Sequence, residues 1–228
     1  MKKLTIHQSE NAHRFSLDSI LLAENIFPKK NNRILDLGCG CGIISILLAN
    51  KNPDITIVGI DIQESSILIA KQNVLKNELK GKVKVLCKDM RTIKGDTFKK
   101  FHKVVCNPPF RKKNSGRKNT SKAIAIAREE IFCTIDDIMK VSRKVLINLG
   151  ELIVIYPAER IGEIIIKMNN YNLETKEMIP IYSKNNSNAK WFIIKGRLNA
   201  KPGLIVKAPV YTDQLTFSAV PKEENDEE

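Results

Sequence analysis

The chain has 228 residues, of which 43% are apolar and 28% are charged, a balance typical of a globular protein with one substantial core. No apolar run approaches the roughly 20 residues that a membrane-spanning helix needs, and the first residues are unlike a secretory signal. These features predict a single domain, residues 1–220, in the cytoplasm. Because the five cysteines and three histidines lack the spacing of a zinc site, we expect reduced thiols and no metal.

The formal net charge is +13, but the charge is unevenly distributed. The last seven residues, Lys222–Glu228, contain five acids and one base, a net charge of −4, which leaves +17 on the preceding sequence. We expect residues 221–228 to form a disordered, solubilising tail. The positive remainder favours a polyanionic partner, with nucleic acid first and an anionic membrane surface second. A lysine-rich composition without functional meaning explains the charge equally well.

Short β-branched runs alternate with segments of helical period from residue 32 onward. The runs predict strands over residues 34–37, 55–60, 83–86, 104–106 and 152–155. The segments between them predict helices over residues 42–50, 63–79, 123–132 and 134–148. A helix at about 159–169 and extended stretches around 178–181 and 191–194 follow. The pattern predicts an α/β fold, with a mostly parallel sheet and an antiparallel C-terminal edge.

A glycine-rich turn follows the first predicted strand. Asp36 precedes it, and its glycines let backbone amides approach a ligand at a helix N-terminus. A dinucleotide fingerprint, G-x-G-x-x-G, does not fit, because Ile43 and Ser45 occupy the final glycine positions. The spacing instead resembles the first motif of class I methyltransferases, in which the acid serves the methionine end of S-adenosylmethionine. The cofactor-binding backbone would be that of Gly38, Cys39, Gly40 and Gly42. A turn without function is the alternative.

Two further acids close the second and third predicted strands. Asp61 is placed to accept hydrogen bonds from both ribose hydroxyls, and Asp89 from an adenine amino group. Their neighbours Ile62 and Met90 are further candidate cofactor contacts. Each acid taken alone could instead cap the following helix or turn. Because parallel strands end at one edge, we expect the three acids to converge on one crevice.

The fourth predicted strand leads into Asn107-Pro108-Pro109-Phe110, the candidate catalytic residues. The prolines remove backbone donors and fix φ, so the Asn107 amide and the Pro108 carbonyl form a rigid pair of acceptors. A planar amino group that donates to both would direct its lone pair at a methyl-sulfonium. Positioning then replaces a strong general base, and Phe110 would stack on the substrate. A strand exit with only a structural role is the alternative.

A run of basic residues follows the tetrapeptide directly. Residues 111–122 contain six bases, no acid and no large apolar residue, which predicts a mobile loop. At the mouth of the site these charges would meet the phosphates of a nucleic acid. Alone, the run would be an ordinary solvated segment. The candidate RNA-binding residues are Arg111, Lys112, Lys113, Arg117, Lys118 and Lys122.

The tetrapeptide resembles the N-P-P-[YF] motif of amino methyltransferases that act on adenine N6, guanine N2 or glutamine N5. Together with Gln8 and residues 13–23, 125–130 and 156–160, it makes the chain similar to the bacterial tRNA adenine-N6 methyltransferases that modify adenine 37 of a valine tRNA. The resemblance implies a Rossmann-like class I methyltransferase fold with a seven-stranded sheet and helices on both faces. It also implies S-adenosyl-L-methionine as cofactor, S-adenosyl-L-homocysteine as product, tRNA as partner and no obligatory protein partner.

The same resemblance implies that residues 1–30 form a helical cover, with Phe15, Ser16 and Asp18 near the methionine moiety. An amphipathic first helix capped by Ser16 is the alternative. The chain departs from the family at Phe110, where relatives more often have Tyr, and at Glu129, where they more often have His. These departures put a hydroxyl or imidazole role at either position in doubt.

Three other functions remain open from the sequence. Ribosomal RNA guanine-N2 methylation and protein glutamine-N5 methylation use the same tetrapeptide. A non-catalytic RNA-binding protein on this fold is the third. The intact set of polar site residues argues against loss of catalysis; it comprises Asp36, Asp61, Asp89 and Asn107.

Overall fold

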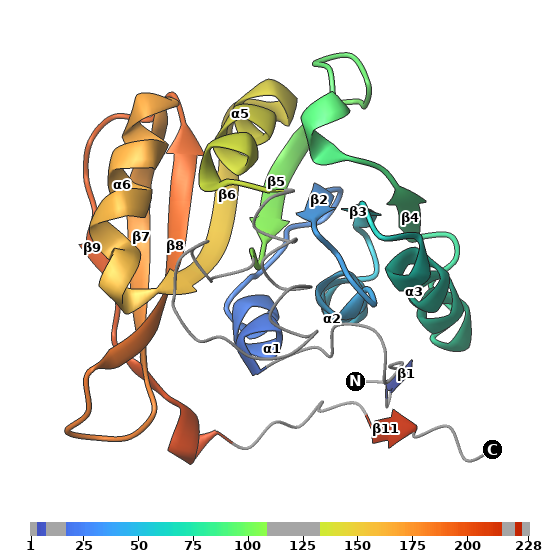
Figure 1. Cartoon of the computed structure of the whole chain (residues 1–228), viewed down its shortest axis with the longest axis horizontal. Coiled ribbons are helices and arrows are strands. Elements are labelled where there is room, and N and C mark those ends of the chain that lie inside the picture. Colours follow the sequence, from blue (N-terminus) through green and yellow to red (C-terminus); the bar gives the residue numbers. More distant parts are fainter. Residues whose placement is uncertain (1–3, 8–16, 109–132, 216–221, 225–228) are drawn as a thin grey trace, which may run out of the picture.

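The computed structural model describes residues 4–7, 17–108, 133–215 and 222–224. Within these ranges a central sheet has nine strands in the order β10-β7-β8-β6-β5-β2-β3-β4, with β9 paired to β7 (Figure 1). The seven longer strands are β2 (Arg33–Leu37), β3 (Thr56–Asp61), β4 (Val83–Cys87), β5 (Phe101–Cys106), β6 (Leu146–Pro157), β7 (Leu173–Tyr182) and β8 (Ala189–Leu198). They confirm the predicted seven-stranded sheet, to which β9 (Ile205–Val206) and β10 (Val210–Tyr211) add short pieces beside β7.

The strand directions agree with the predicted mixed sheet. Strands β2 to β6 pair in parallel, while β8 lies between β6 and β7 and is antiparallel to both. The start of β8 therefore lies at the carboxyl edge of its neighbours. Trp191 pairs with Pro157 at the end of β6 and with Ile181 near the end of β7.

Helices cover both faces of the sheet, and each face has its own apolar core (Figure 1). One face carries α1 (Leu17–Glu24), α2 (Ile43–Lys51) and α3 (Glu64–Lys76), and the other carries α5 (Ile135–Val145) and α6 (Ile161–Asn170). Helix α2 is buried from Ile43 to Ala49, because it packs on the sheet between α1 and α3. Apart from Ser45, its sequence from Ile43 to Ala49 is apolar, as such an enclosed helix requires.

Two predicted helices end earlier than expected. Helix α3 stops at Lys76 and not at residue 79, since Glu78 adopts a left-handed conformation with φ 60°. The helix predicted over residues 134–148 begins with a capping box at Thr134 and ends at Val145. Strand β6 begins at the next residue, where Leu146 pairs with Phe101. The helix predicted over residues 123–132 lies outside the described residues.

Two short strands from opposite ends of the sequence, β1 and β11, lie side by side on the α3 side of the molecule (Figure 1). Strand β1 (Thr5–His7) pairs in parallel with β11 (Lys222–Glu224), so three residues of the predicted disordered tail form a paired strand. Short 3-10 turns complete the described structure: η1 (Met90–Thr92), η2 (Ala158–Arg160) and η3 (Thr212–Gln214). Of the helices in the described ranges, none is long and apolar enough to cross a membrane.

Candidate active site

The predicted polar residues meet at the carboxyl edge of four adjacent strands. Leu37 at the end of β2 pairs with Ile60 of β3 and with Cys106 of β5, and Asp61 pairs with Cys87 of β4. The residues that follow these strands therefore share one edge. Ligands of open α/β sheets bind at this edge, at the topological switch point where the order of the strands reverses. The convergence expected from the sequence is present.

The glycine-rich turn is open on the side that faces this edge. Gly38, Gly40 and Gly42 have φ angles of 69°, 52° and 85°, which other residues rarely adopt. Gly38 N donates to the Ile60 carbonyl at 2.9 Å, and Gly40 N donates to Asp61 Oδ2 at 3.0 Å. Apart from the chain neighbours, no atom of the described residues lies within 4 Å of the place where a Cβ would stand on Gly38 or Gly40. The turn thus offers a backbone cradle held firmly by β3.

Cys39 holds the turn against the sheet. A Cβ on Gly59 would lie 3.0 Å from Cys39 Sγ, so the thiol packs onto bare backbone of β3. Burial raises the pKa of Cys39 well above its usual range and that of Cys41 to about 11. Both thiols are therefore uncharged packing groups. The Cys39 backbone nitrogen donates to the Ile60 carbonyl at 3.0 Å, and the Cys39 carbonyl accepts from Gly42 N at 2.8 Å, so a cofactor contact of this backbone stays a prediction.

Asp36, near the end of β2, is fully buried. Its Oδ2 accepts a hydrogen bond from Ser45 Oγ at 2.7 Å, and no donor in the described residues reaches Oδ1. Burial raises the pKa of Asp36 to about 7, with the Ser45 bond lowering it and the charge of Asp61 raising it. A cation beside Oδ1 would favour the charged form. The position fits the ammonium group at the methionine end of the expected cofactor.

Asp61 and Asp89 both bind nearby backbone, but only Asp89 performs the capping role that was the alternative to ligand binding, because the N-cap of α3 is Gln63. Gln63 N donates to Asp61 Oδ1 at 2.9 Å, so this carboxylate joins the glycine turn to the start of α3. Asp89 caps η1 and forms a bidentate pair with Arg91, which lowers the pKa of Asp89. Each carboxylate oxygen has a second lone pair. Their contacts with ribose and adenine therefore stay predictions.

Two apolar residues flank these acids. Ile62 has 41% of its surface exposed directly after β3, which leaves a flat apolar face beside Asp61. Met90 is partly buried, and its sulfur lies 3.5 Å from the thiol of Cys133. An adenine ring needs an apolar setting of this kind, and the two residues lie on neighbouring strand ends.

Asn107 connects the catalytic motif to α1. Its side-chain nitrogen donates to Ser19 Oγ at 2.9 Å and to Asp18 Oδ2 at 3.3 Å. Both partners are buried residues of α1, and Pro108 is buried as well. Asn107 Oδ1 is also buried, yet it accepts no hydrogen bond from the part of the chain that the structure describes. The two bonds of the side-chain nitrogen thus fix the orientation of the amide, and its Oδ1 is left without a donor from the described residues.

Several predicted site residues lie outside the described residues. They are Phe15, Ser16, Pro109, Phe110, Arg111, Lys112, Lys113, Arg117, Lys118, Lys122 and Glu129. Within the described ranges, no group of His, Cys, Asp and Glu side chains could hold a metal ion.

Sequence reasoning missed residues that orient the site from other elements. Ser19 and Ser45 hold Asn107 and Asp36, and Asn73 of α3 donates to the Cys41 carbonyl at 2.9 Å. Asn73 is completely buried. A polar residue on the buried face of an amphipathic helix is a signal that could have identified it.

Comparison with known proteins supports the resemblance. The family model described as "methyltransferase small domain" matches residues 11–168. A tRNA1(Val) (adenine(37)-N6)-methyltransferase of Trichodesmium erythraeum is 32% identical over 163 residues, covering 70% of this chain and 66% of the relative. A protein of the same name from a Flavobacteriaceae bacterium is 26% identical over 156 residues, covering 68% and 64%. The matched segment spans a little under two thirds of these relatives.

The fold has a close counterpart among solved structures. A predicted O-methyltransferase from Agrobacterium tumefaciens superposes with a TM-score of 0.69, at 16% identity, over 91% of this chain and 99% of that one. At this identity the likeness concerns the fold alone. It confirms the Rossmann-like class I methyltransferase architecture that the motifs predicted.

Proposed function

Because the chain belongs to the methyltransferase small domain family, we propose that it transfers a methyl group to the exocyclic N6 of an adenine in tRNA. S-adenosyl-L-methionine is the cofactor of this chemistry: when bound, it supplies a methyl group on a sulfonium and leaves as S-adenosyl-L-homocysteine. The choice of adenine in tRNA is supported by the tetrapeptide motif and by the names of the relatives.

The residues of the carboxyl edge fit this cofactor. The open backbone of Gly38 and Gly40 has room for its methionine end, with the free Oδ1 of Asp36 available to its ammonium group. Asp61 would hold the ribose. Asp89, with the apolar faces of Ile62 and Met90, would hold the adenine.

One observation carries the proposed reaction: the buried Oδ1 of Asn107, to which none of the described residues donates a hydrogen bond. A buried acceptor without a donor is unfavourable by about 1–3 kcal/mol, so a site that retains one is built to receive a donor. An exocyclic amino group supplies that donor. Ser19 and Asp18 fix the amide plane, so the bound amino group can hold only one orientation.

Positioning then does most of the catalytic work. An amino group that donates to Asn107 Oδ1 and to the Pro108 carbonyl points its lone pair away from both acceptors. No described histidine lies among these residues, and an activated methyl donor needs no strong base, since the proton can leave to water after transfer.

The finer substrate that we propose is adenine 37 of a valine tRNA. The names of the relatives support it, and so does the basic segment 111–122 that follows the motif. An adenine in a single-stranded anticodon loop also enters a pocket at a lower unstacking cost than a paired base.

The first test identifies the methylated nucleoside. The protein is incubated with a labelled methyl donor and bulk tRNA, and the tRNA is digested to nucleosides. We expect the label in N6-methyladenosine. Label in N2-methylguanosine, or in added translation factors and not in RNA, would replace the proposal with one of its two rivals, and cofactor binding without turnover would indicate a non-catalytic protein.

The second test identifies the nucleotide. A valine tRNA transcript with adenine at position 37 is compared with an otherwise identical transcript carrying guanine there. Methylation of the first alone is expected. Equal labelling of both would place the target elsewhere in the tRNA.

A further inference from the structure

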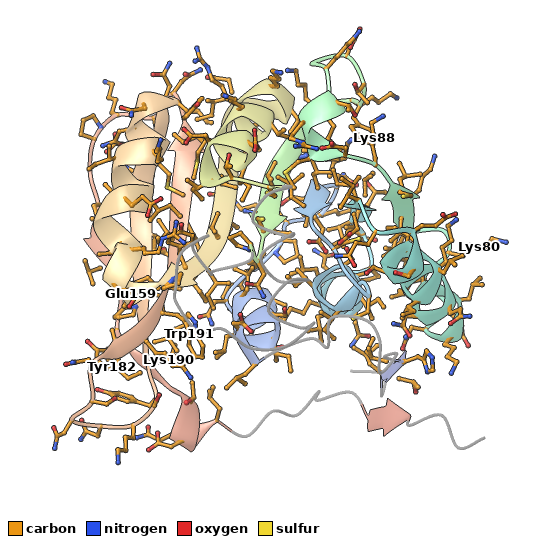
Figure 2. The ribbon with its side chains drawn as sticks, viewed as in Figure 1. Lys80, Lys88, Glu159, Tyr182, Lys190 and Trp191 are labelled. Atoms are coloured by element: carbon orange, nitrogen blue, oxygen red, sulfur yellow. The ribbon has the colours of Figure 1, made fainter. Side chains whose placement is uncertain are left out.

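A group of aromatic and basic side chains lies at the carboxyl edge beyond the site. We call it the aromatic edge surface; it consists of Tyr182, Lys190, Trp191 and Tyr211. Figure 2 shows Tyr182, Lys190 and Trp191 together where β7 ends and β8 begins. The rings of Tyr182 and Tyr211 have centroids 5.6 Å apart, and Lys190 Nζ lies 4.2 Å from the centroid of the Trp191 ring.

The surface continues the edge on which Asn107 lies. Strand β6 separates β5 from β8, so Trp191 is two strand spacings, about 10 Å, to the side of the catalytic strand. Cys106 pairs with Val154, whereas Trp191 pairs with Pro157 three residues further along β6. Trp191 therefore lies further than Asn107 along the strands, toward the carboxyl edge. If one base of a nucleic acid is held at Asn107, a neighbouring nucleotide would lie in this direction.

Charge and accessibility suit a single-stranded nucleic acid. Lys190 and Lys184 are exposed, and neither forms an ion pair within the described ranges. Trp191 is partly buried: it packs against the core below it, and Lys190 covers its ring. Two exposed acids lie nearby. Figure 2 shows Glu159 above Lys190 and Trp191, toward α6, and Asp213 follows β10, with its backbone nitrogen donating to the Ser183 carbonyl at 3.2 Å. Phosphates would thus be favoured beside Lys190 and disfavoured toward α6 and beside Asp213.

We propose that the aromatic edge surface binds a nucleotide that flanks the methylated base, with its base stacked on Trp191 and its phosphate paired with Lys190. This inference rests on the proposed RNA substrate and adds a second contact to it. Lys190 would leave the ring as the base arrives, exchanging a cation–π contact for a charged hydrogen bond to phosphate.

A membrane surface suits this group less well. The turn beside it, residues 183–188, is composed of Ser, Lys and Asn and offers no apolar side chain for insertion. Flat rings combined with lysines and amide groups are instead the features by which proteins bind unpaired bases.

The protein provides its own probe, because Trp191 is the single tryptophan of the chain. The full-length protein is titrated with an unlabelled RNA stem-loop that contains the target adenine, while tryptophan emission is recorded. A labelled copy of the same RNA measures binding independently by anisotropy. We expect emission to fall with the same midpoint as the anisotropy change, and S-adenosyl-L-homocysteine alone to leave emission nearly unchanged.

Modified RNA separates stacking from charge. Each nucleotide flanking the target is replaced in turn by an abasic residue, which keeps the phosphate and removes the base. One such replacement should restore tryptophan emission in the complex and weaken binding by about tenfold, as expected when one stacked base is removed. This measurement needs no protein variant, so it does not depend on how substitutions affect folding.

Two variants and a matched control complete the test. Trp191→Leu should raise the KM for RNA about tenfold with kcat within twofold, and Lys190→Ala should weaken RNA binding and lower its salt dependence. Lys80→Ala removes another exposed lysine, before β4 and away from the aromatic edge surface (Figure 2), and should change neither RNA binding nor its salt dependence. RNA binding that leaves Trp191 emission unchanged would overturn the inference while the tRNA substrate stands. Absence of both RNA binding and methylation would overturn the two together.

Discussion

Asp36 and Asn107 share a rare condition, since each has a buried side-chain oxygen to which no described residue donates. Other side chains with an unpartnered buried atom occur in the described ranges, but those atoms are nitrogens or a hydroxyl: Arg33, Asn50, Ser142 and Arg197. The two acceptors lie at one edge, beside an open glycine turn. An unpaired buried acceptor destabilises the folded protein, so its presence marks where ligand donors belong.

The first prediction concerns Asn107. Asn107→Ala should lower kcat by about 100-fold or more, the usual effect of removing one oriented hydrogen-bonding group from a reacting site. Affinity for S-adenosyl-L-homocysteine, measured by calorimetry, should change little. Ser19→Ala removes one of the two bonds that orient the amide and should lower kcat less, by about tenfold. Turnover of Asn107→Ala within threefold of the native rate would contradict the assignment.

The second prediction follows from the pKa of Asp36, which burial raises to about 7. Between its ordinary value of 3.8 and about 7, the folded protein holds a proton that the unfolded chain releases, so stability falls as pH rises through this interval. Asp36→Asn removes the effect. In the cofactor-free protein, Tm of the variant relative to the native chain should therefore increase from pH 4 to pH 8. A difference that does not vary with pH would show that Asp36 titrates normally.

Helix α3 acts at the scale of elements, because Asn73 within it and Asn77 at its C-cap bind the backbone of β1 as a neighbouring strand would. Asn73 exchanges hydrogen bonds with the backbone of His7 at 2.8 and 3.0 Å, and Asn77 does the same with Thr5 at 3.1 and 2.7 Å. Asn73 also reaches the carbonyl of Cys41. The N-terminal strand, α3 and the glycine turn are thus joined through one buried side chain.

The third prediction separates these two asparagines. Asn73→Ala and Asn77→Ala should both lower the free energy of unfolding, by about 1–3 kcal/mol each, because buried backbone groups are left without partners. Only Asn73→Ala should also weaken cofactor binding, since only Asn73 supports the glycine turn. Chemical denaturation and calorimetry measure the two effects. An equal decrease of cofactor affinity in both variants would indicate that the N-terminal strand, and not the turn, is responsible.

The elements that the sequence predicted well are those with a strong local pattern. The β-branched runs of β2 and β3 alternate with helices, and this order alone implied a parallel sheet and a shared edge for Asp36 and Asp61. The ends of elements were harder to predict. The pattern of α5 continues past Val145, but tertiary pairing takes Leu146 into the sheet. Strands of two residues, such as β9, are too short to show a period.

The hydrogen-bond acceptors of the candidate site could be predicted from the sequence, but the residues that hold them in place could not. Asp36 and Asn107 lie in recognisable motifs, whereas the residues that hold them come from elsewhere in the chain. Asn107 and Ser19 are 88 positions apart, and Asn73 and Cys41 are 32 apart. No local pattern encodes such contacts. Asp89 and Arg91, which form a bidentate pair, are only two residues apart in the sequence. Their pairing nevertheless depends on a side-chain rotamer that the sequence does not specify.

At the scale of the whole molecule, Asn107 and the aromatic edge surface lie at a single edge of the sheet. Under the proposed function, the net charge of +13 would support binding of RNA across that edge, with base contacts at Asn107 and Trp191. Phosphate contacts would then provide affinity, and the inserted base would provide specificity.

The fourth prediction tests whether phosphate contacts, and not total charge alone, provide the affinity for RNA. Changing Lys112, Lys113 and Lys118 to Glu should weaken tRNA binding and flatten its salt dependence by about 0.7 to 0.9 in log–log slope for each phosphate that is no longer neutralised. The same charge change at Lys71, Lys80 and Lys84, which are exposed on α3 and around the start of β4, is the matched control and should have a smaller effect. Equal slopes for the two triple variants would show that only the total charge matters.

The reversed direction of β8 bears on how such a protein can diversify. In a purely parallel sheet, each connection at the carboxyl edge leads into a helix whose packing restricts its length. The connection between Tyr182 and Ala189 is a hairpin turn instead, exposed from Ser183 to Asn186. Insertions in this turn would alter the surroundings of the proposed RNA substrate without shifting a helix or breaking a strand pair. Under the proposed function, substrate choice could therefore change at the hairpin over evolution while the methyl-transfer step proposed for Asn107 stays fixed.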